Sequence, residues 1–586
     1  MRPPSLQNFY LERPAILLIV ITFISVFMWI GRGDFYTKGE PREASVALSM
    51  IEKNQWILPD VYADEISYKP PLVHWLTALF SLPEGKVTPF SSRLPSALAF
   101  TGLIFCSFLF FGRNLRLQES FLASMILLTV FELHRAGMTA RVDMLLTFLI
   151  VWALTRLFRW EEKKKLSGFP WFISLIMSLA VLTKGPVGIV LPLLVFGIYL
   201  LFLRYNFWRI VAKLIPLALF ASIIPLIWYF LAYQQGGKEF LDIVYAENIG
   251  RFLKIDNLNI QYDLGHEKNL LYNLKTLFAG FIPWTILLFI SLFCLSYKRF
   301  PGIKAFWSNI TKMEKTKLFS VITIIIIFLF YSLPLSKRSV YLMPIYPFIA
   351  IFIAQYIIYL TEYKTIIIRI FALFIGILAC LLGLIVLLTI TTNLINPSDL
   401  ILSMLNKYDW AVQFSAIWKT AHFSILLSIF LLIILAYSIY VLFKSLHKKF
   451  YLKTLYAIFG VYLSSLLIID GLLLPAYKDA VSVQPVANKI KERYLVTNNN
   501  LFVMNNLFEY NNMYGLNFYL HNCLRNFEKV SPIEGYFLTG NKSFEKVLQK
   551  YEFFYNFDLL EEFPNYSRDG EQIIQIYFFS KRRLIY

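Results

Sequence analysis

Apolar runs about 20 residues long recur through most of this 586-residue sequence and decide what the chain can fold into. A helix that crosses a membrane needs about 20 mainly apolar residues, because the hydrocarbon core is about 30 Å thick and each residue rises about 1.5 Å. The sequence therefore predicts a polytopic α-helical membrane protein with about 13 transmembrane helices. The predicted segments lie at about residues 14–31, 93–111, 119–134, 143–159, 170–183, 186–203, 209–233, 271–297, 318–335, 340–361, 366–391, 422–443 and 453–475.

The composition agrees with a membrane protein and excludes other classes. Hydrophobic residues make up 58% of the chain and the mean hydropathy is +0.59, more than a soluble core of this length can use. The formal charge of +19 would suggest a nucleic-acid partner in a soluble protein. Here the basic residues lie between apolar runs, so membrane topology accounts for them and no nucleic-acid partner is predicted.

The basic loops set a predicted orientation, because Lys and Arg concentrate on the cytoplasmic side of membrane helices. If the N-terminus is cytoplasmic, alternate loops must be basic. They are basic at residues 113–116, 156–165, 204–213, 298–317, 364–369 and 444–449. An odd number of crossings then leaves the C-terminus on the outer face.

The C-terminal tail is polar and differs from the rest of the chain. Its segments NLFVMN, GYFLTG and IIQIYFFS resemble strands, and residues 542–551 resemble a helix. The sequence predicts a soluble α/β domain outside the membrane at residues 476–586. Residues 1–475 form the predicted transmembrane domain, with a first outer loop at 31–92 and a second at 234–271.

Two amphipathic helices are predicted in the first outer loop, because apolar residues recur at helical spacing from Glu43 to Ile51 and from Leu72 to Leu79. Such helices are expected to lie at the membrane interface. Pro70 and Pro71 begin the second helix, since proline there needs no backbone donor and presets φ. They hold Lys69 beside the helix, and His74 is interpreted as a packing residue.

Charged side chains gather in the predicted outer loops, and charges at membrane depth are costly unless they share a site. An excess of Lys and Arg suits a phosphate group, whereas a carboxylate among them suits a general base. The residue types therefore predict a membrane enzyme that handles a phosphorylated lipid. The acids are Glu40, Asp143 and Glu247, and the cations are Arg42, Lys69, Arg141, Lys184, Arg251 and Arg338.

Seven motifs on this face resemble, in order, those of the membrane glycosyltransferases that include the aminoarabinose transferases of lipid A and the protein O-mannosyltransferases. The resemblance covers about residues 30–350. The motifs are GEPREA, YKPPLVHWL, SSRLPSAL, TARVDMLLTF, VLTKGPVG, ENIGRF followed by GHEKNLLY, and SKRSVYLMPIYP.

The resemblance implies a GT-C fold and a polyprenyl-phosphate sugar as donor, with undecaprenyl phosphate as the lipid in a bacterium. It implies inverting transfer to a lipid A-like or other glycan acceptor at the outer face of the bacterial inner membrane. The N-terminus would then be cytoplasmic and the C-terminal domain periplasmic. Protein O-mannosyl transfer stays open as an alternative acceptor chemistry, and transport of a lipid-linked sugar as an alternative function.

The resemblance also implies roles for individual residues. The first acid of the related motif falls on Gly39, so the catalytic residue is expected to be Glu40 or Asp143. The six cations named above are expected to bind the donor phosphate. The substrate cavity is expected to include Tyr68, Glu247, His266, Tyr341 and Tyr346.

Metal binding is not predicted from the resemblance. An acid that can join a histidine in holding a metal is replaced by Tyr68, while His266 matches that histidine. A divalent metal is left open as a cofactor.

Overall fold

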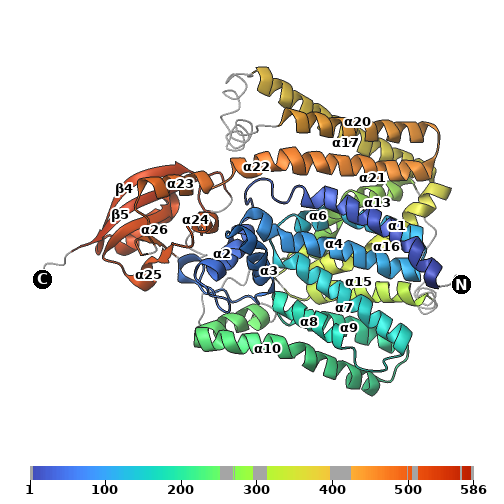
Figure 1. The fold of residues 1–586 in the computed structure, drawn as a ribbon, viewed down its shortest axis with the longest axis horizontal. Helices are drawn as coiled ribbons and strands as arrows, with labels where there is room; N and C mark the ends of the chain where they lie inside the picture. The colour runs from blue at the N-terminus through green and yellow to red at the C-terminus, as the bar shows by residue number, and fades with distance from the viewer. Residues whose placement is uncertain are drawn as a thin grey trace.

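The computed structural model consists of a bundle of long helices with a smaller α/β part at one end (Figure 1). It describes residues 4–250, 268–269, 271–294, 313–334, 336–395, 424–497, 499–504, 512–567 and 570–582. The helices of the bundle are α1 (Pro4–Thr22), α4 (Pro89–Asn114), α5 (Leu117–Thr129), α6 (Phe131–Gly137), α7 (Val142–Lys164), α8 (Trp171–Lys184), α9 (Val187–Phe202), α10 (Phe207–Tyr245), α12 (Leu271–Gly280), α13 (Trp284–Cys294), α15 (Lys315–Ser332), α16 (Tyr346–Tyr363), α17 (Thr365–Ile395), α20 (Ile425–His447) and α21 (Tyr451–Ile468).

The described helices make the chain a multi-pass membrane protein. Seven of them are long and apolar enough to cross a membrane, and two bent pairs, α6 with α7 and α12 with α13, turn by 113° and 103°. Shorter apolar helices add further segments. Each predicted segment overlaps at least one of these helices, and segment 119–134 spans the break between α5 and α6. One end of each of the segments 271–297, 318–335 and 422–443 lies outside the described residues. The number of crossings stays a prediction.

The first outer loop folds over the end of the bundle as α2 (Gly39–Glu52) and α3 (Leu72–Ser81). Pro71 is the residue before α3, and its carbonyl accepts a hydrogen bond from the Trp75 N–H at 2.8 Å. The predicted helix start is thus confirmed to within a residue or two. Short 3-10 helices follow at Tyr62–Asp64 and Leu82–Glu84.

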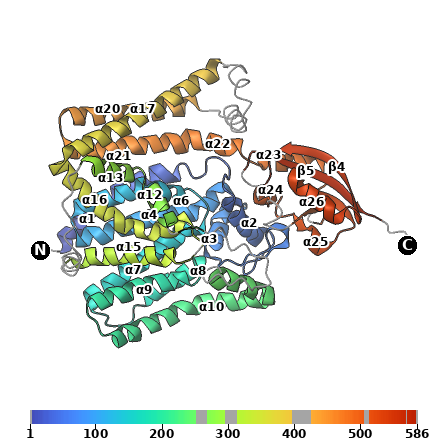
Figure 2. The ribbon, with the colours of Figure 1, turned by 180° about the vertical axis from the view of Figure 1, so that it is seen from behind.

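The interfacial position predicted for α2 is wrong. Both views show α2 between the bundle and the α/β part (Figures 1 and 2). Its apolar residues, including Ala47, pack with Ala78 of α3 and with Phe518 of α24 (Tyr514–Tyr519). The apolar stripe of α2 therefore packs against protein and not against lipid.

The α/β part contains one five-stranded sheet in the order β2-β1-β3-β5-β4. β1 pairs in parallel with β2 and β3, while β5 pairs antiparallel with β3 and β4. The elements are α22 (Leu474–Ala480), α23 (Gln484–Arg493), β1 (Leu501–Val503), β2 (Arg525–Asn526), α25 (Phe527–Val530), β3 (Glu534–Gly540), α26 (Asn541–Tyr551), β4 (Tyr555–Pro564) and β5 (Ile573–Lys581).

The structure confirms the predicted strands β1, β3 and β5 and the helix α26. The prediction missed β4, an edge strand whose residues are mostly exposed and include Asp558, Glu561 and Glu562. Such a strand needs no apolar alternation. The predicted domain boundary at residue 476 falls inside α22, and the predicted start of the second outer loop falls inside α10.

Hydrogen bonds tie the α/β part to the first outer loop. The Asn522 side chain donates to the Ser45 carbonyl at 2.9 Å and to Ser49 Oγ at 2.8 Å. Arg525 Nε forms an ion pair with Asp64 Oδ1 at 2.6 Å. α2 is therefore positioned from both sides, by the bundle and by the α/β part.

We expect Gly188→Ala to lower the melting temperature of the purified protein. A Cβ at Gly188 would lie 2.5 Å from the carbonyl carbon of Ala180, so α8 and α9 would have to separate. Overpacking of this kind typically costs about 1–3 kcal/mol. Gly460→Ala in α21 is the control, because its Cβ would meet nothing within 4 Å. Equal melting temperatures for the two variants would contradict the tight α8–α9 contact.

Candidate functional site at the end of the bundle beside the α/β part

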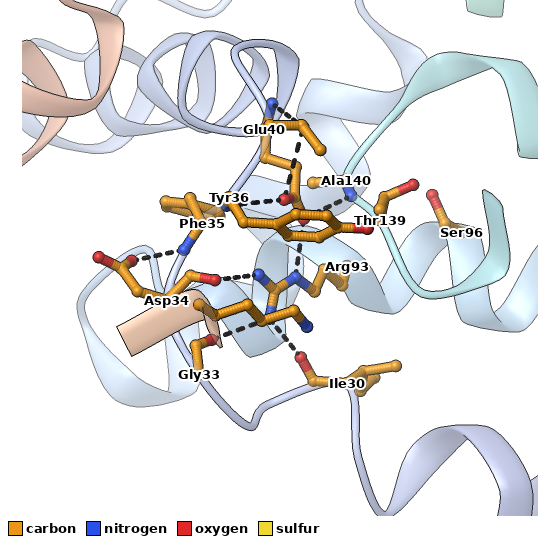
Figure 3. Close-up of polar contacts among 12 residues, drawn as sticks. Ile30, Gly33, Asp34, Phe35, Tyr36, Glu40, Arg93, Ser96, Thr139 and Ala140 are labelled. Atoms are coloured by element: carbon orange, nitrogen blue, oxygen red, sulfur yellow. Dashed lines mark hydrogen bonds and ion pairs between the residues drawn. The ribbon is translucent and has the colours of Figure 1, made fainter. Parts of the chain in front are cut away.

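A buried ion pair between Arg93 and Glu40 lies beneath the first turn of α2 (Figure 3). Arg93 Nε donates to Glu40 Oε1 at 2.8 Å, and neither side chain has any exposed surface. The rest of the guanidinium donates to the carbonyls of Ile30, Gly33 and Asp34 at 2.7–3.1 Å. One side chain of α4 thus fixes the path of the chain from α1 into α2.

The Glu40 carboxylate is fully engaged by protein groups. Besides Arg93, the N–H groups of Ala140 and Tyr36 each donate to it at 3.3 Å. Burial acts to raise the pKa of Glu40, but the charges of Arg93 and Lys478, together with the hydrogen bonds from Arg93 and the Tyr36 N–H, hold the pKa below its usual value. This environment favours a structural role, and the catalytic role predicted for Glu40 stays untested.

A second carboxylate of α2, Glu43, lies between two partners from the YKPPLVHWL motif. Lys69 Nζ forms an ion pair with Glu43 Oε1, and His74 Nε2 lies 2.7 Å from Glu43 Oε2. The His74 side chain is buried, whereas that of Lys69 is 29% exposed. Burial and the nearby Arg42 charge lower the pKa of Lys69 to about 8, despite the opposing effect of Glu43.

Three of the predicted site residues form a chain of hydrogen bonds beside this pair. Arg42 Nη2 donates to the Tyr68 hydroxyl at 2.9 Å, and that hydroxyl donates to Glu247 Oε1 at 3.0 Å. The Arg42 guanidinium also lies 5.8 Å from the ring centre of Tyr514 in α24. Arg42, which was predicted to bind phosphate, therefore meets Tyr68 and Glu247, two of the residues predicted to line the cavity.

A second group forms around Asp143 at the start of α7. Lys184 Nζ, in the last turn of α8, forms an ion pair with Asp143 Oδ1 and lies 4.4 Å from the ring centre of Tyr341. The charges of Arg141 and Arg338 act on the same carboxylate. The Arg338 side chain is exposed. These predicted site residues are therefore brought together.

Arg141 lies against the N-terminus of α2. A Cβ at Gly39 would lie 3.1–3.3 Å from three atoms of the Arg141 guanidinium group. Arg141 Nε is buried and has no hydrogen-bond partner among the residues that the structure describes. Gly39 therefore leaves this cation without a carboxylate at that position.

The two groups lie next to each other. Glu247, which accepts from Tyr68, is followed by Asn248 in the short π-helix Ala246–Gly250. Asn248 Oδ1 would lie 2.8 Å from a Cβ at Gly185, the residue after Lys184. The group around Glu43 and the group around Asp143 thus border one region above the helix ends.

The remaining predicted residues do not join this arrangement. Tyr346 is 1% exposed and stacks on Phe281 with ring centres 4.3 Å apart, so it packs the interior instead of lining an open cavity. Arg251 and His266 lie outside the described residues. Within the described part of the chain, no three His, Cys, Asp or Glu side chains are grouped as metal ligands would be.

Three residues of the site were not predicted from the sequence, namely Glu43, His74 and Arg93. All three lie inside motifs that were recognised, GEPREA, YKPPLVHWL and SSRLPSAL. The packing role expected for His74 is incomplete, because its ring also contacts a carboxylate. These residues could have been found because each is a charged or imidazole side chain in a predicted helix. Such a side chain needs a polar partner if the helix is buried.

The sequence of this chain is similar to those of known proteins. Residues 68–229 match the family described as dolichyl-phosphate-mannose-protein mannosyltransferase. An undecaprenyl phosphate-alpha-4-amino-4-deoxy-L-arabinose arabinosyl transferase from Shewanella sediminis is 24% identical over 353 residues, 58% of this chain and 59% of the relative. A protein of the same name from Enterobacter is 25% identical over 325 residues, 54% of each chain. The chain thus spans less than two thirds of the length of these relatives.

The whole fold matches a solved structure. ArnT from Cupriavidus metallidurans bound to undecaprenyl phosphate superimposes with a TM-score of 0.65 at 16% identity, over 97% of this chain and 98% of ArnT. The chain therefore has the predicted GT-C fold. The predicted relationship to the glycosyltransferases of the aminoarabinose-transferase type is confirmed.

We expect Glu40→Gln to destabilise the protein, because it leaves the buried Arg93 guanidinium without a counter-charge. Removing one partner of a buried ion pair typically costs about 3–5 kcal/mol. Arg116→Gln is the control, since that guanidinium is exposed and its pair with Glu119 spans 3.9 Å. Melting temperatures of the purified variants measure the difference. A Glu40→Gln protein with wild-type melting temperature and no turnover would instead support the predicted catalytic role.

Proposed function

We propose that this protein is an integral-membrane glycosyltransferase that moves a sugar from a polyprenyl phosphate, undecaprenyl phosphate in a bacterium, to a lipid A-like or other glycan acceptor. The observation that carries the proposal is the buried Nε of Arg141, which has no hydrogen-bond partner among the described residues. Its charge acts on Asp143 of the Asp143–Lys184 pair, and its guanidinium lies against Gly39, one turn of α2 before Glu43 of the Glu43–Lys69 pair. A guanidinium and two ammonium groups that border one region are suited to hold a phosphate.

The donor phosphate is proposed to bind Arg141, Lys184, Lys69 and Arg42, with Arg338, Arg251 and the cavity residues around them. A phosphate diester that leaves as a lipid monophosphate needs its growing negative charge stabilised, and these cations supply that stabilisation. Asp143 holds Lys184 in place. It also stays a candidate for acting on the acceptor, as predicted.

The proposed placement is the outer face of the inner membrane, with a cytoplasmic N-terminus and a periplasmic C-terminal domain from residue 476. The basic loops support this orientation. Residues 1–475 are the proposed catalytic domain. The alpha-linked donor in the names of the relatives, together with a single displacement, would make the transfer inverting.

Two alternatives receive less support. The match to a mannosyltransferase family covers residues 68–229 and leaves protein acceptors open. A transporter would be expected to carry charges along a pathway through the membrane. The ion pairs of Glu43 and Asp143 instead lie near the ends of helices at one end of the bundle.

We expect Arg141→Ala to weaken undecaprenyl phosphate binding at least tenfold, because a charge-assisted contact is worth about 1.5–3 kcal/mol. Arg156→Ala is the matched control, since it removes an arginine from α7, the helix that Arg141 precedes, at a distance from the proposed site. Titration of labelled undecaprenyl phosphate into protein in lipid nanodiscs measures both. Unchanged binding by Arg141→Ala, or no binding by the wild type, would contradict the proposal.

Binding of undecaprenyl phosphate should also weaken as the pH rises above about 8. The pKa of Lys69 is lowered to about 8, so the free protein loses this positive charge above that pH. The apparent dissociation constant should rise about tenfold per pH unit until the bound state also titrates. Lys69→Arg keeps its charge and should bind equally from pH 7.5 to 9.5. A wild-type curve as flat as that of the Arg variant would exclude Lys69 from the phosphate site.

A further inference from the structure

The two glutamates of α2, Glu40 and Glu43, have opposite surroundings, although only two residues separate them. Glu40 accepts from Arg93 Nε, from the N–H groups of Ala140 and Tyr36, and from the Thr37 hydroxyl at 3.5 Å. A carboxylate offers about four acceptor positions. Glu40 therefore has none left for a substrate, and its side chain has no exposed surface.

Glu43 has acceptor positions to spare. Among the described residues its carboxylate has two partners, Lys69 Nζ and His74 Nε2. The Glu43 side chain is 10% exposed and that of Lys69 is 29% exposed, so this pair reaches the surface of the site. Glu43 also lies four residues after Gly39 on α2, which places both positions on one face of the helix, the face where Gly39 meets Arg141.

The contact with His74 assigns the proton on that ring. Its Nε2 lies 2.7 Å from Glu43 Oε2, and its buried Nδ1 has no partner among the described residues. A carboxylate only accepts, so Nε2–H donates to it. His74 thus holds Glu43 in place from its buried side.

Lys69 can exchange partners in a way that His74 cannot. Its ammonium group has three donors on a flexible stem, and part of the side chain is exposed, whereas His74 is buried. A donor phosphate would compete with Glu43 for this ammonium group. Once Lys69 contacts the phosphate, Glu43 loses its main counter-charge and gains a negative neighbour, and both changes raise its affinity for a proton.

We propose that Glu43 is the catalytic base, with His74 as its positioning residue, and that Lys69 passes from Glu43 to the donor phosphate when the donor binds. This inference rests on the proposed function and names the carboxylate that replaces the acid absent at Gly39. It makes the base effective after the donor is in place.

The step balances as a single displacement. The proton of an acceptor hydroxyl passes to a Glu43 carboxylate oxygen while the acceptor oxygen forms a bond to the anomeric carbon. The bond between that carbon and the phosphate oxygen breaks, and its electron pair stays on the phosphate. Polyprenyl phosphate leaves as a phosphomonoester, and Glu43 later gives its proton to water.

The test compares binding with turnover in full-length protein reconstituted in nanodiscs. Binding is measured with undecaprenyl phosphate. Turnover is measured as loss of radiolabelled 4-amino-4-deoxyarabinose, glucose or mannose from undecaprenyl phosphate in the presence of lipid A. For Glu43→Gln we expect a dissociation constant no more than threefold above that of wild type, because the variant removes the carboxylate that competes with the phosphate for Lys69. We also expect turnover lower by about 10²–10⁴-fold, and loss of the rise in rate with pH that the base produces. The control is Glu52→Gln, at the end of the same helix and partnered by His521 at the surface, which should keep wild-type values.

Each outcome decides between defined possibilities. Glu43→Gln with turnover within threefold of wild type overturns the inference, whether Asp143 is the base or the acceptor is a phosphate that needs none. Wild-type protein that neither binds undecaprenyl phosphate nor consumes any donor overturns the proposed function itself. If Glu43→Gln does not fold, Glu43→Asp decides: normal binding with turnover at least tenfold lower supports the inference, and wild-type turnover overturns it.

Discussion

The ion pair between Arg93 and Glu40 is the interaction on which the rest of the site depends. Arg93 lies on a membrane helix, and its guanidinium collects three carbonyls of the incoming chain together with a carboxylate of α2. An arginine this buried would be prohibitively costly alone, so the segments that surround it must be ordered together. The start of α2 is thereby fixed relative to the bundle, and with it the direction of every side chain that α2 contributes.

From that fixed helix the charges of the site are arranged in pairs. Glu43 meets Lys69, and Asp143 meets Lys184, so two ammonium groups are neutralised in the protein without ligand while both remain partly exposed. Pairing lowers the cost of holding cations near a membrane. Under the proposed function, the donor phosphate takes over these partners, because an ammonium group exchanges contacts without moving the backbone.

The α/β part contributes to the same end of the molecule. Asn522 and Arg525 contact the first outer loop, and the Tyr514 ring lies near the Arg42 guanidinium. The predicted tail domain is thus not an independent appendage on the bundle. Its packing covers the outer side of α2, which explains why a helix with an apolar stripe is buried in protein instead of resting on lipid. Loop, bundle and tail together enclose the proposed site.

The sequence alone determined the apolar helices, the order of the motifs and the kinds of charge in the segments between those helices. These features follow from local properties, because an apolar run long enough to cross a membrane can be recognised without knowing what packs against it. Which charged side chains pair with each other was decided only by the tertiary structure. Glu40 and Glu43 are alike in sequence and adjacent on α2, yet one meets an arginine from α4 and the other a lysine and a histidine from the next motif. Which acid is enclosed and which keeps free acceptor positions depends on where distant segments place their donors, and no local pattern encodes that.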